Sequence, residues 1–371
     1  MIGTADVVII GAGIAGASLA ARLAGTGTVL LLDMEDHPGF HTTSRSAAMW
    51  EPSFGPPIFR ALTHASGPFL HEPPDGFSPT PLVTPRGVMM CGEHDDGSDP
   101  AEFIARGYVE IPRSEAAALV PQLRVDELAW ILLDDLTKDV DVDALHQGFL
   151  RAARAGGCTV ECRARVERAT RNGTWTIDTA AGPVSTPLVV IAAGAWGDQV
   201  ARLFGAAPVG LEPRRRSACI IAAPASADIN RWPQIFPARE DFYCKPTGGQ
   251  LMLSPCDATP VDPHDAYADD FKLAEGIAAY ERLIDHGVNR IERSWGGLRT
   301  FAPDGNPVVG YDPEVEGLFW LTGQGGYGIQ SSPALSEVAA ALLHRKGIPP
   351  AIAKHGITVE AISPARFRAD D

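Results

Sequence analysis

The feature that most constrains this chain is a glycine-rich turn near its N-terminus, Gly11-Ala12-Gly13-Ile14-Ala15-Gly16, which has the spacing GxGxxG. The apolar run 6–10 before it predicts a buried parallel strand, and residues 17–23 after it predict a helix. A second strand, residues 28–32, ends at Asp33. In such a βαβ unit the glycines permit a tight turn, close approach of a pyrophosphate and packing of helix on strand, and the acid accepts a hydrogen bond from a ribose hydroxyl. The sequence therefore predicts a dinucleotide site.

Two further segments favour a flavin over a nicotinamide dinucleotide. Residues 41–48, His-Thr-Thr-Ser-Arg-Ser-Ala-Ala, supply hydroxyls, one cation and small side chains soon after the predicted acid. The cluster 323–328, Gly-Gln-Gly-Gly-Tyr-Gly, precedes a helix that we expect over 332–344, with Ser332 as its N-cap and Pro333 at its first position. The positive end of that helix would stabilise a reduced, anionic flavin ring.

The remaining pattern predicts two interleaved lobes. The N-terminal unit is extended by a helix and several strands, at 140–155, 159–166, 174–178, 184–191 and 317–322. The next part of the chain has a different pattern. It predicts an antiparallel sheet with strands at 214–222, 241–245 and 250–254, followed by a helix at 271–286. Residues 52–100, rich in Pro, Gly and His, are expected to form surface loops. We therefore expect an α/β fold in which a Rossmann-like FAD-binding domain (1–85, 140–208 and 300–371) is interleaved with an α+β substrate-binding domain built on an antiparallel sheet (86–139 and 209–299).

Composition argues against several classes of function. The chain carries 31 basic and 46 acidic residues, a net charge of −15, which argues against non-specific nucleic-acid binding and against docking to an anionic membrane. Cys158 and Cys162 have no histidine or second cysteine pair near them, so we expect free thiols and no metal site. No basic leader segment stands at the start, and glycines and Arg22 interrupt the apolar run 7–32. We expect a cytoplasmic protein without an integral membrane segment.

Motifs along nearly the whole chain resemble the FAD-dependent D-amino-acid oxidase superfamily, in its glycine oxidase and sarcosine oxidase branch, and most of all its bacterial D-arginine dehydrogenases. These motifs are GAGIAGAS (11–18), HTTSRSAA (41–48), DALHQGFLR (143–151), AAGAW (192–196), RRRSA (214–218), FYCKP (242–246), WGGLRTFAPDGNPVVG (295–310) and GQGGYGIQ (323–330). The resemblance implies a non-covalent FAD, because residues 300–302, Thr-Phe-Ala, stand where some relatives tether the flavin through a cysteine. The residues that it implies for FAD binding are Gly11, Gly13, Ile14, Ala15, Gly16, Asp33, Met34, Thr42, Thr43, Ser44, Arg45, Ser46, Ala47, Ala48, Val166, Ala193, Gly194, Trp196, Arg299, Gly325, Gly326, Tyr327, Gly328, Ile329 and Gln330.

The same resemblance implies three catalytic residues. Arg299 stands where relatives pair a guanidinium with the substrate α-carboxylate, and Tyr243 stands where a phenol donates to that carboxylate. Arg216 matches a further active-site arginine. Because side chains alternate along a strand, we expect at most one of Arg215 and Arg216 to face the substrate, and a solvated surface charge is the alternative for either. The implied reaction is hydride transfer from the substrate Cα to flavin N5, which gives an imino acid that water hydrolyses to the 2-oxo acid. No general base is evident.

Departures from the D-arginine dehydrogenase pattern bear on the substrate. Val88 replaces the acid that binds the cationic side chain, Met49 replaces a histidine, and Phe54 replaces a lid tyrosine. An apolar pocket cannot repay the desolvation of a guanidinium, so we predict a neutral or hydrophobic D-amino acid. Glu51 and Glu240 could supply the missing charge instead, and Met49 and Phe54 could simply be core residues. The expected substrate pocket comprises Met49, Phe54, Val88, Gly326 and Tyr327.

Alternatives remain for the electron acceptor and for the reaction. Met252 stands where sarcosine-oxidase relatives have an oxygen-activating lysine, which favours a dehydrogenase that passes electrons to a quinone or another acceptor over an oxidase that uses O2. Oxidation of a secondary amine, such as an N-methyl or cyclic amino acid, would use the same arginine and tyrosine, for example in natural-product biosynthesis. A non-catalytic flavin-binding scaffold is the third possibility, but it would not need a carboxylate clamp.

Overall fold

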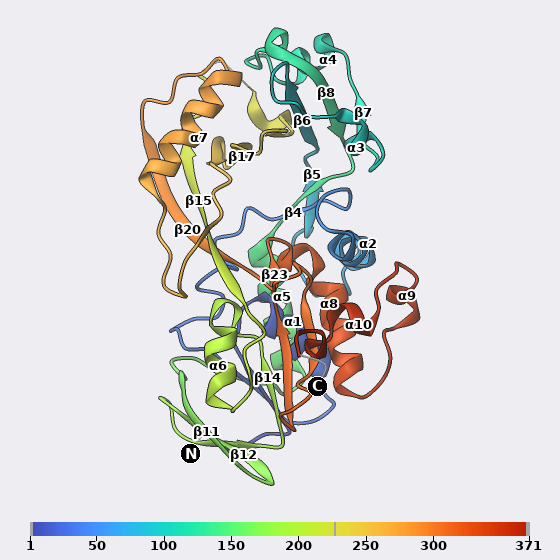
Figure 1. Ribbon diagram of the computed structural model, residues 1–371, viewed down its shortest axis with the longest axis vertical. Helices are drawn as coiled ribbons and strands as arrows, with labels where there is room; N and C mark the ends of the chain where they lie inside the picture. Colours follow the sequence, from blue (N-terminus) through green and yellow to red (C-terminus); the bar gives the residue numbers. More distant parts are fainter. Residues whose placement is uncertain (1–2, 226–227, 369–371) are drawn as a thin grey trace.

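The computed structural model describes residues 3–225 and 228–368 and has an elongated shape with two lobes (Figure 1). The long strands β15 (Glu212–Ile221) and β20 (Ile291–Phe301) extend between the lobes. The outermost residues of the predicted FAD-binding domain, 1–2 and 369–371, lie outside the described residues. The helices α1 (Ile14–Leu23), α5 (Val142–Ala155) and α8 (Gly328–Leu343) lie in the lower lobe. The helices α4 (Arg113–Leu119) and α7 (Asp270–Leu283) lie in the upper lobe.

The lower lobe contains a six-stranded sheet of order β10-β3-β2-β14-β22-β21, in which only the β21–β22 pair is antiparallel. Its strands are β2 (Val7–Ile10), β3 (Val29–Leu32), β10 (Thr159–Glu161), β14 (Leu188–Ile191), β21 (Val308–Tyr311) and β22 (Leu318–Thr322). The central strands are buried almost throughout, as continuous apolar runs in a sheet covered on both faces must be. The strand β2 lies between β3 and β14, so the order of the strands reverses direction at β2. In α/β folds, ligands bind at the carboxyl ends of the strands beside such a switch point.

The upper lobe is built on a ten-stranded sheet of order β23-β20-β15-β18-β17-β16-β6-β8-β7, with β19 paired to β15. All its pairs are antiparallel except β16–β6. The strands of residues 88–134 thus share one sheet with those of residues 212–301. The remaining strand bounds are β6 (Val88–Glu93), β7 (Val109–Glu110), β8 (Leu128–Asp134), β16 (Gln234–Pro237), β17 (Tyr243–Thr247), β18 (Gln250–Ser254), β19 (Thr259–Pro260) and β23 (Gln324–Gly325).

Two small sheets and several short helices complete the fold. One sheet has the order β1-β13-β12-β11 and the other β4-β9-β5. Their strands are β1 (Gly3–Thr4), β4 (Met49–Trp50), β5 (Val83–Pro85), β9 (Lys138–Val140), β11 (Val166–Asn172), β12 (Thr174–Thr179) and β13 (Val184–Thr186). The other helices are α2 (Pro57–His71), α3 (Pro100–Ile104), α6 (Gly197–Leu203), α9 (Pro350–Ala353), α10 (Val359–Ile362), and the 3-10 turns Val125–Glu127, Gly194–Trp196, Ile229–Arg231 and Pro364–Phe367. Within the described ranges, none of the helices combines the length and apolarity needed to cross a membrane.

Three sequence expectations about local structure were wrong. Residues 52–100 are not mainly loops, because they contain the helix α2 and the strands β5 and β6; Pro57 stands at the start of α2, where its missing N–H costs nothing. The predicted strand 184–191 is divided by Pro187 into β13 and β14, which belong to different sheets. The predicted strand 159–166 likewise divides into β10 and the start of β11.

The C-terminal helix also begins earlier than expected. The helix α8 starts at Gly328, so Ser332 and Pro333 lie inside it and do not cap it. Pro333 cannot donate to the carbonyl of Ile329 four residues before it. The hydroxyl of Ser332 donates to that carbonyl at 2.9 Å and compensates for the missing bond. The helix therefore tolerates its internal proline, and its N-terminus directly follows the glycine cluster 323–328.

Candidate active site

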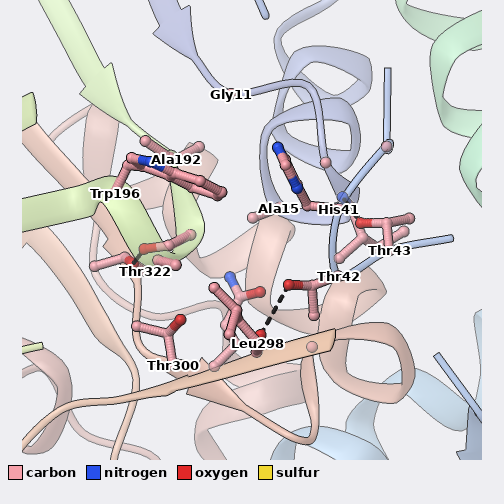
Figure 2. A pocket seen from close by; sticks show the side chains of 18 of the residues that line it. Gly11, Ala15, His41, Thr42, Thr43, Ala192, Trp196, Leu298, Thr300 and Thr322 are labelled. Atoms are coloured by element: carbon pink, nitrogen blue, oxygen red, sulfur yellow. Dashed lines mark hydrogen bonds between the residues drawn. The ribbon is translucent and has the colours of Figure 1, made fainter. Parts of the chain in front are cut away.

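A cavity of about 420 Å³ lies at the carboxyl ends of β2, β14 and β22 and continues to the sheet of the upper lobe. Asp33 and Met34 line one end, and Arg216, Tyr243 and Arg299 line the other. In Figure 2, Ala192 and Trp196 lie on one side of this cavity, and Thr42 and Thr43 lie on the other. Both lobes therefore contribute side chains to one continuous space.

The glycine turn fits its place only without side chains. Gly11 has a φ of +106°, and a Cβ built on it would lie 2.4 Å from the carbonyl oxygen of Ala192. A Cβ on Gly16 would lie 1.9 Å from the carbonyl oxygen of Gly11, so the start of α1 packs directly against the turn. Gly13 caps α1 without a side chain, and the helix N-terminus therefore faces the cavity, as anion binding requires.

Asp33 organises this end of the cavity. Its Oδ2 accepts a hydrogen bond from the N–H of Ala12 at 2.8 Å, and its Oδ1 accepts one from Glu35 at 3.0 Å. Burial is the main cause that raises the pKa of Asp33. The predicted ribose acceptor thus also ties β3 to the glycine turn. His146 of α5, which was not predicted as a site residue, donates from Nε2 to the carbonyl of Ala12 at 2.9 Å and holds the same turn.

The segment 41–48 is held against both lobes. Thr43 accepts the N–H of Ile14 through Oγ1 at 3.0 Å, and Thr42 donates to the carbonyl of Leu298 at 2.8 Å (Figure 2). The guanidinium of Arg45 donates to the carbonyls of Ala266 and Gly296 and pairs with Asp265. Arg45 lines the cavity, but its guanidinium already bonds to these three residues. Arg45, which was predicted to bind the cofactor, therefore also holds the segment 41–48 against the upper lobe.

Most of the residues predicted to bind the cofactor line this one cavity. They are Gly11, Gly13, Ile14, Ala15, Asp33, Met34, Thr42, Thr43, Arg45, Ser46, Ala47, Val166, Ala193, Gly194, Trp196, Arg299, Gly325, Gly326, Gly328 and Ile329. Five predicted residues are not among its lining residues: Gly16, Ser44, Ala48, Tyr327 and Gln330. Gly16 packs beneath Gly11, Ser44 and Ala48 line a neighbouring pocket, Tyr327 stacks on Phe59, and Gln330 accepts the N–H of Glu51. His41 and Thr322, which were not predicted, also line the cavity.

The other end of the cavity concentrates positive charge. Arg216 on β15 and Arg299 on β20 line it together with Tyr243, while Arg215 points to the opposite face and pairs with Asp269. The Nε of Arg216 donates to the carbonyl of Asp257 at 2.6 Å. Among the described residues, no carboxylate forms an ion pair with Arg216 or Arg299, and burial, together with the charge of Arg216, lowers the pKa of Arg299. Two recessed cations without acidic partners favour an anionic ligand.

A backbone segment covers one of these cations. A Cβ on Gly326 would lie 3.1 Å from Nη1 of Arg299, so the glycine lets the main chain pack on the guanidinium. Gly326 lines the cavity, and α8 begins two residues later. The guanidinium of Arg299 and the N-terminus of α8 therefore face the same part of the cavity.

Three residues of the expected substrate pocket lie behind the cavity wall. Met49, Phe54 and Val88 are not among the lining residues of the cavity. They pack in an apolar cluster that contains Tyr243, which we call the Tyr243 cluster: Met49, Val88, Met90, Tyr108, Trp130, Leu132, Ile220, Phe236, Tyr243 and Met252, with Phe54 at its edge. Val88 is 0% exposed because its side chain packs in this cluster, on the central strand β6 that lies between β16 and β8. These residues support the wall around Tyr243, and their contact with a substrate stays a prediction.

A buried carboxyl belongs to the same region. Glu51 is 8% exposed, and its Oε1 accepts a hydrogen bond from the hydroxyl of Tyr108 at 2.9 Å. Burial raises the pKa of Glu51 to about 7; Asp134 acts in the same direction, and the hydrogen bond from Tyr108 opposes the shift. The sequence marked Glu51 only as a possible charge for a cationic side chain, and it gave no sign of Tyr108, which is distant in the chain.

The raised pKa of Glu51 predicts how stability depends on pH. The ordinary pKa is 4.5 and the folded-state pKa is about 7, so between these values the folded state binds more protons than the unfolded state. The free energy of unfolding should therefore fall as the pH rises through this window, by on the order of 3 kcal/mol from this group. Glu51→Gln should lack that part of the fall, as measured by urea unfolding at pH 4.5 and pH 8. Equal pH dependence in both proteins would contradict a buried, protonated Glu51.

The two ends of the cavity suit the two ends of a flavin dinucleotide. The cradle at Gly11, the N-terminus of α1 and the carboxyl of Asp33 suit a pyrophosphate and a ribose at one end. The N-terminus of α8 and the two arginines suit a ring system that gains negative charge at the other end. The residues present therefore fit FAD.

Comparisons with known proteins agree with this geometry. A family model described as FAD dependent oxidoreductase (DAO) matches residues 6–342. The chain is 26% identical over 254 residues to glycine oxidase of Geobacillus kaustophilus, covering 67% of this chain and 63% of that protein. It is 24% identical over 346 residues to mitochondrial sarcosine dehydrogenase of Mus musculus, covering 85% of this chain and 37% of that protein. The aligned sequence segments thus span less than two thirds of the length of either relative.

Solved structures show the same fold. The crystal structure of glycine oxidase from Geobacillus kaustophilus superposes with a TM-score of 0.80 at 22% identity, covering 92% of this chain and 95% of that chain. Iminodiacetate oxidase from Chelativorans sp. BNC1 gives a TM-score of 0.79 at 22% identity, covering 96% and 98%. The expected α/β fold class, with mixed parallel and antiparallel sheets, is confirmed.

Proposed function

Because the chain belongs to the DAO family of FAD-dependent oxidoreductases, we propose that it oxidises the amine of an amino acid whose carboxylate is bound by Arg299, Arg216 and Tyr243. The observation that carries this proposal is the pair of arginines that line the cavity without an acidic partner among the described residues. A carboxylate supplies the missing negative charge, and a guanidinium can bind it with two hydrogen bonds. The tyrosine hydroxyl adds a third donor.

In this proposal one end of the cavity binds the dinucleotide part of FAD, and the other end binds the substrate. Gly11, Gly13 and the start of α1 hold the pyrophosphate of FAD, and Asp33 holds a ribose. Bound FAD supplies the electron acceptor for the hydride that leaves the substrate Cα. Arg299 and Tyr243 fix the carboxylate and thereby the direction of the Cα–H bond, which is the main requirement of this chemistry. The imino acid that results is hydrolysed by water to the 2-oxo acid and ammonia.

We propose a D-amino acid with a neutral or hydrophobic side chain as the substrate. The region beyond Tyr243 is the apolar Tyr243 cluster, and Val88 stands where an acid for a cationic side chain is expected. The second candidate is a secondary amine, which the names of two similar proteins, sarcosine dehydrogenase and iminodiacetate oxidase, favour. A secondary amine with a carboxylate would use the same two arginines.

We also propose a dehydrogenase that passes electrons to a quinone or another acceptor. The side chain of Met252 is 4% exposed, and Met252 on β18 stands opposite Lys245 on β17 in the register of the sheet. The ammonium of Lys245 lies 2.5 Å from the carboxylate of Asp139 and is engaged in that ion pair. Met252 offers no charge that could activate O2.

The experiment is anaerobic mixing of the FAD-loaded protein with D-Met, D-Phe, D-Arg, L-Met, sarcosine and iminodiacetate, with bleaching of the visible flavin band as the signal. We expect D-Met or D-Phe to exceed D-Arg in kcat/KM by about 100-fold, since burying an unpaired guanidinium costs roughly 3 kcal/mol. A preference for D-Arg would contradict the side-chain proposal, and reduction by sarcosine or iminodiacetate alone would favour the second candidate. Absence of bleaching with every compound would favour a scaffold. Adding air or a quinone to the reduced protein then compares the acceptors, and the quinone should reoxidise it faster.

A further inference from the structure

A second cavity, of about 410 Å³, lies beside the cavity proposed for FAD and the substrate. The two cavities meet at Arg45, Ser46 and Ala47, which line both. The other walls of the second cavity come from β9, β15, β17, β18 and β20. The reaction proposed above leaves this space without a role.

The strands of the upper lobe place the second cavity next to the arginine end of the first. Residues two apart on a strand share a side of the sheet and lie about 7 Å apart. On β17, Tyr243 lines the first cavity and Lys245 lines the second. On β20, Arg299 lines the first cavity, and Trp295 and Arg293 on the same side of the strand line the second. The second cavity therefore begins beside the carboxylate site and the flavin ring, far from the end that contains Asp33.

The second cavity is lined by basic side chains. Arg45, Lys245 and Arg293 line it, and the described residues of its lining include no aspartate or glutamate. Serine and threonine hydroxyls add hydrogen-bond donors. The whole chain carries a net charge of −15, so this lining is a local reversal of its charge. A recess with this lining attracts anions.

The charge of Lys245 is only partly compensated. The carboxylate of Asp139 lies 2.5 Å from the ammonium of Lys245 and 2.7 Å from the guanidinium of Arg86, so one negative charge serves two cations. Lys245 is 8% exposed, and Asp139 is its ammonium's one hydrogen-bond partner within the described part of the chain. Burial lowers the pKa of Lys245, and the charge of Arg86 acts in the same direction. An anion in the cavity would supply the missing negative charge.

Arg293 offers a second cation on the same side of the sheet. It is exposed, and its guanidinium lies 5.3 Å from the ring centroid of Trp295. The neighbouring acid, Glu292, pairs with Arg290, and the described residues provide no carboxylate partner for Arg293. The Nε1 of Trp295 donates to the carbonyl of Arg45 at 3.1 Å, which fixes the ring against the segment where the two cavities meet. The aromatic ring and the two cations suit a flat ligand that carries negative charge.

We propose that the second cavity binds the electron acceptor of the reaction, and that this acceptor is a quinone with a negative charge held by Lys245 and Arg293. This inference rests on the proposed function. In the step, two electrons and one proton pass from the reduced, anionic flavin to the quinone, which takes a second proton from water and becomes the hydroquinone. Because the amino acid and its product occupy the arginine end of the first cavity, a separate cavity lets the acceptor bind beside them.

The first test measures binding without turnover. The probes are 2-hydroxy-1,4-naphthoquinone, which is an anion at pH 8, and its neutral methyl ether, 2-methoxy-1,4-naphthoquinone. Calorimetry uses the oxidised, FAD-loaded protein without an amino acid, so the quinone receives no electrons. We expect the wild type to bind the anion at least about 10-fold more tightly than the ether, and Lys245→Met and Arg293→Met each to lose most of this preference.

The matched control for both substitutions is Arg290→Met. Arg290 is a cation near the start of the same strand, but it pairs with Glu292 and is not among the lining residues of the second cavity. This variant should keep the preference of the wild type. Because Arg293 is exposed, its variant tests the site even if Lys245→Met folds poorly. An anion that binds at Arg299 instead would be preferred equally by all four proteins, and that result would overturn the proposal.

The second test follows electron transfer in the same proteins. The flavin is reduced anaerobically by illumination with EDTA and then mixed with each quinone. The rate constant for reoxidation by the anion should fall about 10-fold in Lys245→Met and Arg293→Met, while the rate with the ether should stay unchanged. If the rate with the anion stays the same, or falls by the same factor as the rate with the ether, the cavity is not the acceptor site. Reduction by light needs no amino acid, so this outcome is separate from a failure of the proposed function, in which no amino acid bleaches the flavin.

Discussion

Arg299→Met is expected to lower kcat/KM for flavin reduction by an amino acid by about 1000-fold while leaving the protein as stable as the wild type or more so. A carboxylate that loses a bidentate charged partner in a recessed site loses roughly 3–5 kcal/mol of binding in the transition state, which corresponds to this factor. Arg299 stands beside Arg216 and has no acidic partner among the described residues, and burial lowers its pKa. Removing such a cation relieves an unfavourable interaction in the free protein. Rapid-mixing kinetics and the Tm of the same preparations measure both effects.

The matched control for this substitution is Arg214→Met. Arg214 on β15 stands opposite Arg299 on β20 in the register of the sheet, but it is not among the lining residues of the cavity. Its guanidinium forms an ion pair with Glu212. We expect its kcat/KM to stay within about 3-fold of the wild type, because surface ion pairs contribute little. Arg299→Lys should recover part of the activity, since it restores the charge without the fork of donors. An Arg299→Met protein that keeps full activity would show that the carboxylate is bound elsewhere.

The sequence predicted best those features that depend on neighbours in the chain. The turn 11–16 follows from glycine spacing alone, and the opposite directions of Arg215 and Arg216 follow from the alternation of a strand. Both are local consequences of backbone geometry. The position of Asp33 at the end of β3 belongs to the same class, since a short βαβ unit places it beside the turn.

The features that the sequence could not predict depend on contacts between distant segments. The charge of Arg45 is satisfied by residues 265, 266 and 296, which reach it only once the upper lobe is folded. Glu51 acquires its raised pKa from burial beside Tyr108 and Asp134, neither of which is near it in the chain. Val88 was expected at the substrate; its side chain packs in the Tyr243 cluster and is not among the lining residues of the cavity, so its contact with a substrate stays a prediction. Such contacts leave no periodic signal in a single sequence.

Gly11→Ala is expected to weaken FAD binding by about 100-fold or more. An alanine at a φ of +106° is strained by roughly 1–3 kcal/mol. Its Cβ would in addition lie 2.4 Å from the carbonyl oxygen of Ala192, which belongs to the main chain and cannot rotate away. The turn and the end of β14 must therefore separate, and both line the cavity. Titration of the apoprotein with FAD, followed by flavin fluorescence, measures the loss.

Gly25→Ala separates the two causes of that loss, because it combines a similar backbone conformation with open space. Gly25 has a φ of +77°, and a Cβ there meets nothing within 4 Å. It follows α1, the helix that begins at the turn, so any general weakening of the βαβ unit would affect both variants. We expect Gly25→Ala to lower stability by about 1–2 kcal/mol and to leave the Kd for FAD unchanged. If both variants lost FAD equally, backbone strain in the unit would explain the effect, and close approach between Gly11 and Ala192 would not be the reason that glycine is required at the turn.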